Sequence, residues 1–199
     1  MPGWRASYEC SSFKTDQLPA GGVSEIAVAG RSNVGKSSLI NKLLGARLAH
    51  VGATPGKTRS INFFLVERDG APAFRLVDLP GFGYASRSKS ERDQWARLVG
   101  AYTAGRENLV LILHLVDFRH GLLKNDIALR EWLDGVGIPG LVVFTKGDKI
   151  SRGRHKSTRN AYIRSGLKSV DMPIITSSKD GTGVGELRLF IESYLAMPD

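Results

Sequence analysis

A glycine-rich segment, residues 30–37 (GRSNVGKS), matches the pattern G-x-x-x-x-G-K-[ST] at every defined position. Glycines in such a loop let backbone N–H groups turn inward around a phosphate, and the start of a following helix adds positive potential. Lys36 can then reach the outer phosphates, and the hydroxyl of Ser37 can ligate Mg²⁺. The segment stands between an apolar run and a helical pattern, a context that disfavours the alternative of a plain glycine-rich turn.

A second motif, Asp78-Leu79-Pro80-Gly81, closes another apolar run. An aspartate at the carboxyl end of a strand can hold Mg²⁺ through a water molecule, and the N–H of Gly81 can approach a terminal phosphate. D-x-x-G alone is more often a turn. On a strand expected beside residues 30–37, it indicates a nucleoside triphosphatase.

A third motif, Thr145-Lys146-Gly147-Asp148, concerns the base. A carboxylate at Asp148 can accept hydrogen bonds from the ring N–H and the exocyclic amine of guanine, whereas adenine would leave it unpaired. The motif therefore predicts GTP rather than ATP, although alone it would be interpreted as a surface turn. Residues 176–178 follow the last expected strand, and their N–H groups could meet the guanine oxygen; Ser-rich loops are common, so this is the weakest of the motifs.

Residues 51–60 (VGATPGKTRS) are the candidate for a loop that senses the third phosphate. We expect Thr58, rather than Thr54, to be the second protein ligand of Mg²⁺, drawn in with GTP and released after hydrolysis. The alternative is a plain linker with a turn at TPG. The groups expected closest to the reacting phosphate are Lys36, Thr58 and Gly81.

The elements that must position these motifs alternate along the chain. Short strand patterns alternate with helical ones, and residues 61–66 and 74–79 are joined by Asp69-Gly70, a strong hairpin turn. This order predicts an α/β fold in three layers: a mostly parallel six-stranded sheet with one antiparallel edge strand, and helices on both faces. We expect one domain over residues 23–199 and an extension over residues 1–22.

Composition excludes several classes of protein. The 199 residues are 42% hydrophobic and 24% charged, so a disordered chain is excluded. The single cysteine, Cys10, argues against a disulfide framework and favours the cytoplasm. We find no targeting signal and no membrane segment. Lys and Arg exceed Asp and Glu by 28 to 19, and the excess is concentrated in residues 146–168, as expected either for a phosphate-rich partner or for a solvated helix.

Six segments together resemble the EngB (YihA/YsxC) family of Ras-like (TRAFAC class) GTP-binding proteins. They are GRSNVGKSSL from Gly30, TPGKT from Thr54, Asn62-Phe63-Phe64, DLPGFGYA from Asp78, LVDFRH from Leu115 and TKGD from Thr145. DLPGFGYA is the most specific, because the generic GTPase pattern does not require Gly83-Tyr84-Ala85. The resemblance implies a P-loop G domain and a GTPase needed for assembly of the large ribosomal subunit, and also for normal cell division and septation. Two slight departures are Phe82, where relatives often have Tyr, and Gly147, where Ala is common.

The resemblance also implies which residues meet the ligands. Mg²⁺ would be held by Ser37 and Thr58, and by Asp78 through water. The residues placed at GTP are Gly30, Arg31, Ser32, Asn33, Val34, Gly35, Lys36, Ser37, Gly56, Lys57, Thr58, Arg59, Ser60, Asp78, Leu79, Pro80, Gly81, Thr145, Lys146, Gly147, Asp148, Thr176, Ser177 and Ser178.

Hydrolysis is expected to be slow. Many Ras-type GTPases orient the attacking water with a Gln just after D-x-x-G, but here the residue is Phe82. We therefore expect stimulation by a ribosomal partner; the alternative is a nucleotide-dependent RNA-binding module with negligible catalysis. Asn33 resembles the position that helps to bind K⁺ in several GTPases lacking the Gln, although a side chain bonding within the loop explains it equally well.

The basic segment suggests the partner. Beyond Lys146 it continues into a helical pattern that should lie on the base side of the nucleotide. We expect an rRNA-binding surface on the large ribosomal subunit or its precursor, with a solvated helix as the alternative. The candidate contacts are Arg152, Arg154, Lys156 and Arg159. We expect a monomer that binds GTP and GDP and no membrane.

Overall fold

The computed structural model describes residues 3–50, 60–82 and 89–197. Within these ranges one sheet is formed by seven strands in the order β1-β3-β4-β2-β5-β6-β7. The strands are β1 (Trp4–Ser12), β2 (Glu25–Gly30), β3 (Ile61–Arg68), β4 (Ala71–Asp78), β5 (Leu109–Asp117), β6 (Gly140–Thr145) and β7 (Ile174–Ile175). The helices are α1 (Lys36–Leu44), α2 (Lys89–Ala104), α3 (Lys124–Val136), α4 (Arg152–Arg164) and α5 (Val184–Leu195), and η1 (Thr15–Gln17) and η2 (Gly147–Lys149) are short 3₁₀ helices.

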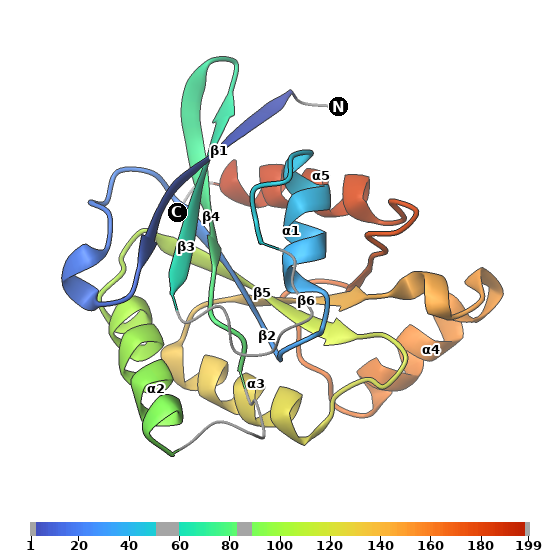
Figure 1. Cartoon of the computed structure of the whole chain (residues 1–199). Helices are drawn as coiled ribbons and strands as arrows, with labels where there is room; N and C mark the ends of the chain where they lie inside the picture. Colours follow the sequence, from blue (N-terminus) through green and yellow to red (C-terminus); the bar gives the residue numbers. More distant parts are fainter. Residues whose placement is uncertain (1–2, 51–59, 83–88, 198–199) are drawn as a thin grey trace.

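The helices cover both faces of the sheet, as Figure 1 shows. The apolar side chains of α1 and α5 share one core cluster with alternate residues of β2, β4, β5 and β6. Those of α2 and α3 pack on the opposite face, where α4 adds a smaller cluster near β6 and β7. The predicted three-layer α/β fold is confirmed.

The predicted number of strands was wrong. Six were expected, but residues 4–12, assigned to an extension, form β1 and pair antiparallel with β3. β3 is therefore not the edge strand of the sheet. β1 was missed because an edge strand is exposed along much of its length: its sequence, WRASYECSS, carries polar residues at positions where a central strand would be apolar.

The hairpin between β3 and β4 is confirmed. The two strands pair antiparallel up to Arg68 and Ala71, so Asp69 and Gly70 form the loop. Both have positive φ, 54° and 82°, as a two-residue type I′ turn requires. The two residues Asp69 and Gly70 therefore specify the geometry of this turn themselves.

A buried charge network ties the edge strand to the middle of the sheet. Glu25, at the start of β2, is fully buried and accepts hydrogen bonds from Tyr102 (2.9 Å) and Arg106 (2.9 and 2.6 Å), and a longer one from Arg75 (3.5 Å). Arg75 also donates to both carboxylate oxygens of Glu9, at 2.7 and 2.9 Å. Glu9 occupies the irregularity in the pairing of β1 with β3. The bulge thus coincides with the residue that joins β1 to the network.

Candidate functional site

The predicted motifs meet at one edge of the sheet. Strands β2, β4, β5, β6 and β7 run parallel to one another. Their carboxyl ends therefore lie side by side, which is where open α/β sheets bind ligands. The residues at these ends are Gly30, Asp78, Asp117, Thr145 and Ile175.

The P-loop, residues 30–37, has the backbone that its sequence requires. Asn33 and Gly35 have positive φ, 63° and 104°, and α1 begins directly afterwards at Lys36. A side chain at Gly30 would bring a Cβ within 3.0 Å of Val34 Cγ1, closer than real Cβ atoms normally approach. The loop is thus closely packed and leads into a helix N-terminus, the arrangement that binds phosphate.

Lys36 and Asp78 face each other across the site. The ammonium group of Lys36 forms an ion pair with Asp78 Oδ1, and both residues are buried. The other carboxylate oxygen of Asp78 accepts a hydrogen bond of 3.5 Å from Asn62. Asn62 Oδ1 in turn accepts one of 3.0 Å from Ser60, which is also buried. The structure therefore brings together the two charged groups predicted at the outer phosphates and the metal.

The D-x-x-G segment packs directly on the P-loop. The N–H of Phe82 donates to Gly30 O at 3.1 Å, and the N–H of Ser32 donates to Phe82 O at 3.4 Å. A Cβ at Gly81 would lie 2.9 Å from Ser32 Oγ and 3.4 Å from the Ser32 backbone, so a larger residue would require the Ser32 side chain to turn away.

The side chain of Phe82 belongs to the apolar core. Its ring makes an edge contact with Trp95, with centroids 5.0 Å apart, and Trp95 donates to Pro80 O at 2.7 Å. Trp95 also contacts Trp132, as expected for core tryptophans. Phe82 therefore has neither the chemistry nor the position to orient an attacking water.

The TKGD loop, residues 145–148, is bound to the P-loop. Thr145 Oγ1 donates to Val34 O at 2.6 Å, and Lys146 Nζ donates to Asn33 O at 2.8 Å. Lys146 has a positive φ of 58°, and its side chain passes 3.8 Å from the position of a Cβ on Gly35. The segment predicted at the base and the segment predicted at the phosphates thus form one connected unit.

Asp148 is oriented by the loop that follows β7. Its Oδ1 accepts a 2.9 Å hydrogen bond from Ser177 Oγ, and the N–H of Gly147 donates to Thr176 O at 2.9 Å. A Cβ at Gly147 would come within 2.8 Å of Ile175 Cγ2. In this chain the alanine common in relatives would need Ile175 to move.

Sequence reasoning did not include Asp117 among the site residues, although its carboxylate contacts Lys146 of the TKGD loop. This buried carboxylate accepts hydrogen bonds from the Arg119 side chain at 2.9 and 2.7 Å and lies 3.0 Å from Lys146 Nζ. Burial alone would raise its pKa, but the hydrogen bonds from Arg119 and Lys146 outweigh burial and hold the pKa of Asp117 well below its usual range. Its place at the end of β5, beside the other motif strands, was the available signal.

The side chain of Arg31 turns towards α3. Its Nε lies 3.4 Å from Asp126 Oδ2, and its Nη2 lies 3.9 Å from Asp117. Burial raises the pKa of the Asp126 carboxyl. Any contact that Arg31 makes with a nucleotide therefore falls to its backbone in this arrangement.

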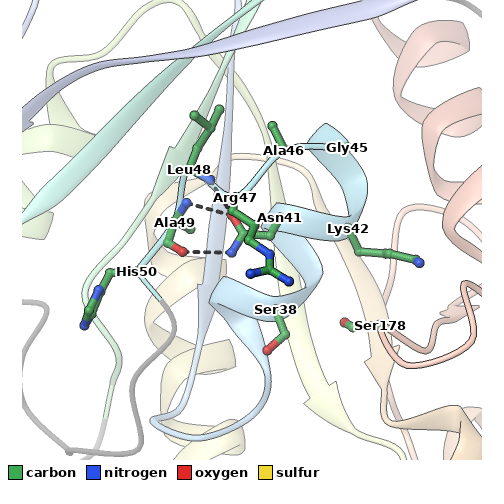
Figure 2. Close-up of a pocket in the computed structure, with 10 residues that line it drawn as sticks. All are labelled: Ser38, Asn41, Lys42, Gly45, Ala46, Arg47, Leu48, Ala49, His50 and Ser178. Atoms are coloured by element: carbon green, nitrogen blue, oxygen red, sulfur yellow. Dashed lines mark hydrogen bonds between the residues drawn. The ribbon is translucent and has the colours of Figure 1, made fainter.

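A cavity of about 930 Å³ runs along α1 beside these motifs. Figure 2 shows Ser38 and Ser178 on facing sides, with Asn41 bonded to the turn beyond the helix. The Asn41 amide accepts from the N–H groups of Leu48 and Ala49 and donates to Ala49 O. Of the residues predicted at GTP, Ser178 alone is among the described residues that line it: Ser38, Asn41, Lys42, Gly45, Ala46, Arg47, Leu48, Ala49, His50 and Ser178.

Three of the four predicted RNA contacts are exposed. Arg152, Arg154 and Lys156 lie on the solvent side of α4. Arg159 is only partly exposed, and its Nη1 donates to Pro173 O at 3.3 Å. Arg159 thus differs from the other three in supporting the chain before β7.

Several predicted residues lie outside the described part of the chain. They are Thr54, Gly56, Lys57, Thr58 and Arg59 in the expected sensing loop, and Gly83, Tyr84 and Ala85 in DLPGFGYA.

Among the described residues, no three His, Cys, Asp or Glu side chains cluster as a metal site. The hydroxyl of Ser37 and the carboxylate of Asp78 offer oxygen ligands of the kind that Mg²⁺ prefers, and Mg²⁺ usually keeps waters and substrate phosphates as its other ligands. The residues present thus fit Mg²⁺. No described helix is long and apolar enough to cross a membrane.

Known proteins are similar to this chain in sequence and in fold. The family model described as "50S ribosome-binding GTPase" matches residues 25–146. "Probable GTP-binding protein EngB" of Syntrophomonas wolfei is 46% identical over 192 residues, covering 96% of this chain and 97% of the relative. The protein of the same name from Pelotomaculum thermopropionicum is 51% identical over 150 residues, covering 75% and 74%. A solved structure described as a probable GTP-binding protein engB aligns with a TM-score of 0.67 at 25% identity, covering 86% of this chain and 98% of its own.

Proposed function

Because this chain belongs to the EngB family of GTP-binding proteins and is a GTPase, we propose that it acts as a slow GTP-dependent switch in assembly of the large ribosomal subunit. The observation that carries the proposal is the joining of the TKGD loop to the P-loop through Lys146 and Thr145, with an exposed basic helix next along the chain. Through the family, the role extends to normal cell division and septation. We place the protein in the cytoplasm as a monomer.

In the proposed complex, the P-loop wraps the phosphates of GTP and Asp148 accepts hydrogen bonds from guanine. Ser37 and Thr58 would hold Mg²⁺, with Asp78 acting through water, and the metal would supply neutralisation of charge on the phosphate oxygens. Lys36 binds the outer phosphates, and the N–H of Gly81 approaches the last one. The ion pair between Lys36 and Asp78 supports this assignment, because it places both charges at one point beside the P-loop.

Hydrolysis by the isolated protein is proposed to be slow. The Phe82 ring packs against Trp95, so this position supplies no group for the attacking water. A K⁺ ion near Asn33 is proposed to supply part of the missing charge stabilisation. Turnover that is equal in KCl and NaCl at matched ionic strength would contradict the K⁺ proposal and leave the proposed GTP switch unaffected.

The proposed partner is the rRNA of the large subunit or its precursor. Arg152, Arg154 and Lys156 present positive charge to solvent, and contacts with phosphates need no base recognition. The family model's description as a 50S ribosome-binding GTPase supports this partner.

The test is GTP turnover by the purified protein with Mg²⁺, with and without large ribosomal subunits. We expect turnover well below about 1 per second alone, the low end of typical enzymes, and a clear increase with subunits. Fast turnover by the protein without ribosomal subunits would overturn the switch proposal. Binding to subunits with no turnover in either condition would instead favour an RNA-binding module with negligible catalysis.

A further inference from the structure

His155 contacts the TKGD loop from α4. Its Nε2 lies 3.1 Å from Gly147 O and 3.0 Å from Ile150 O. Both partners are carbonyl oxygens, which can only accept, so Nε2 carries a proton and donates to both. Gly147 and Ile150 stand on either side of Asp148 and Lys149. The histidine therefore clamps the single 3₁₀ turn, η2, that carries Asp148.

The same turn is held on its other side by the loop after β7. The N–H of Gly147 donates to Thr176 O, and Ser177 Oγ donates to Asp148 Oδ1, both at 2.9 Å. The Cβ position of Gly147 lies 2.8 Å from Ile175 Cγ2 and 3.7 Å from His155 Cε1. Gly147 is thus packed between β7 and the histidine ring. Of these restraints on η2, only the one from His155 comes from a helix.

The ring of His155 is itself held in place. Phe118 makes an edge contact with it, with centroids 5.4 Å apart and planes at 88°. Phe118 in turn contacts Phe144 and Tyr162, and Tyr162 OH donates to Phe118 O at 3.1 Å. Because its aromatic neighbours already restrict the ring, the His155 side chain loses little conformational entropy when it donates to the two carbonyl groups. It can therefore hold those carbonyl groups in place.

We propose that His155 is a positioning residue for guanine recognition: it holds η2 so that both carboxylate oxygens of Asp148 can accept from the base. The inference rests on the proposed role of Asp148. The ring N–H and the exocyclic amine of guanine must be met together, so a small rotation of η2 disturbs the bond to the exocyclic amine as well as the bond to the ring N–H. Loss of the clamp then reduces selectivity for guanine as well as affinity.

The experiment compares the affinities of GDP and IDP by calorimetry. IDP has a hypoxanthine base that keeps the ring N–H and lacks the exocyclic amine. We expect the wild-type preference for GDP over IDP to fall by about tenfold in His155→Ala, the change that one hydrogen bond to a charged group produces. His155→Gln, whose amide nitrogen reaches the position of Nε2, should keep most of the preference. His155→Asn, whose amide overlies Nδ1, should behave like His155→Ala.

Two controls separate the possible outcomes. Ser157→Ala removes an exposed hydroxyl that donates to Arg154 O within α4, and its GDP to IDP ratio should match that of the wild type. Asp148→Ala should lose the preference altogether. If Asp148→Ala loses it but the His155 variants do not, the inference on His155 is overturned and the proposed function stands. If Asp148→Ala keeps it, the proposed base site is wrong. An equal loss for both nucleotides that Gln does not restore would reduce His155 to a structural role and overturn the inference.

Discussion

Lys36, the first residue of α1, is paired with Asp78, the last residue of β4, in a buried ion pair at the edge of the sheet. Both are residues that the proposed mechanism gives to the outer phosphates and to the Mg²⁺ waters. Each charge thus satisfies the other. In the proposed mechanism, contacts to phosphate and to metal-bound water would replace this ion pair.

Lys36→Ala should be destabilising, because it breaks the ion pair, and inactive, because Lys36 is proposed to bind the outer phosphates. Without the ammonium group, the Asp78 carboxylate stays buried without its cation, which should lower the free energy of unfolding of the nucleotide-free protein by about 3 kcal/mol. The double variant Lys36→Ala with Asp78→Asn should recover most of that stability in urea titrations while still failing to hydrolyse GTP. A double variant no more stable than the single one would contradict this account.

The buried His114 should make stability depend on pH. Neither ring nitrogen has a hydrogen-bond partner among the described residues, and burial, with a smaller contribution from Arg130, lowers its pKa from 6.5 to about 4. The unfolded chain therefore binds the proton more readily than the folded protein does. The contribution of neutral His114 to the free energy of unfolding is fully present above about pH 6.5 and is lost as the pH falls towards 4, by about 3 kcal/mol at most. Unfolding of nucleotide-free protein at pH 7 and pH 5 measures the loss.

The matched variant for this prediction is His114→Leu, which keeps the position apolar and cannot titrate. It should lose less stability than the wild type between pH 7 and pH 5, because the remaining loss comes from other groups. Equal losses in the two proteins would contradict the assignment to His114.

Glu25 should support stability without affecting nucleotide binding. It lies at the start of β2, at the opposite end of the strand from the P-loop, and it bonds Tyr102, Arg75 and Arg106. Glu25→Gln should lower the free energy of unfolding by about 3 kcal/mol, because buried cations lose their counter-charge. GDP affinity of the folded variant should be unchanged. The exposed Glu107→Gln is the control, and a similar small effect for both would argue against the network.

The exposed basic residues of α4 and the hydrogen-bonded Arg159 should behave differently with ribosomal subunits. Arg154→Ala and Lys156→Ala should each weaken binding to large subunits and reduce the slope of log affinity against log salt by about 1. Arg159→Ala should chiefly lower the melting temperature, because its guanidinium supports Pro173 O. A steep salt dependence that survives the Arg154 and Lys156 variants unchanged would contradict the proposal that α4 contacts the ribosomal subunit.

Features specified by neighbouring residues could be predicted from the sequence. The P-loop depends on its own glycines and the helix that follows, and the turn at Asp69 and Gly70 depends on two residues able to adopt positive φ. The alternation of strands and helices also predicted that the motif strands would end side by side, but individual side-chain contacts between distant residues could not be predicted. Asp117 meets Lys146 only because β5 and β6 are neighbours in the sheet, and His155 meets Gly147 only because α4 turns back on η2.

The first strand illustrates the same limit from the side of packing. β1 has no apolar run, because it covers one edge of the sheet and exposes residues such as Tyr8, and its place is decided by β3 and by the contact of Glu9 with Arg75. None of these partners is close to it in sequence. A pattern of hydrophobic residues read locally therefore could not distinguish it from an extension.

The pairing of β1 with β3 also bears on the order in which the chain can fold. β1 comprises residues 4–12, but its partner begins at Ile61, so during synthesis β1 must remain unpaired until β2, α1 and the chain up to Ile61 have emerged. Closing a loop of that length costs entropy before any hydrogen bond is gained. An edge strand can be added to a sheet that is already assembled, and the contact between Glu9 and Arg75 can form only then. We expect β1, which is synthesised before its partner β3, to be among the last strands to join the sheet.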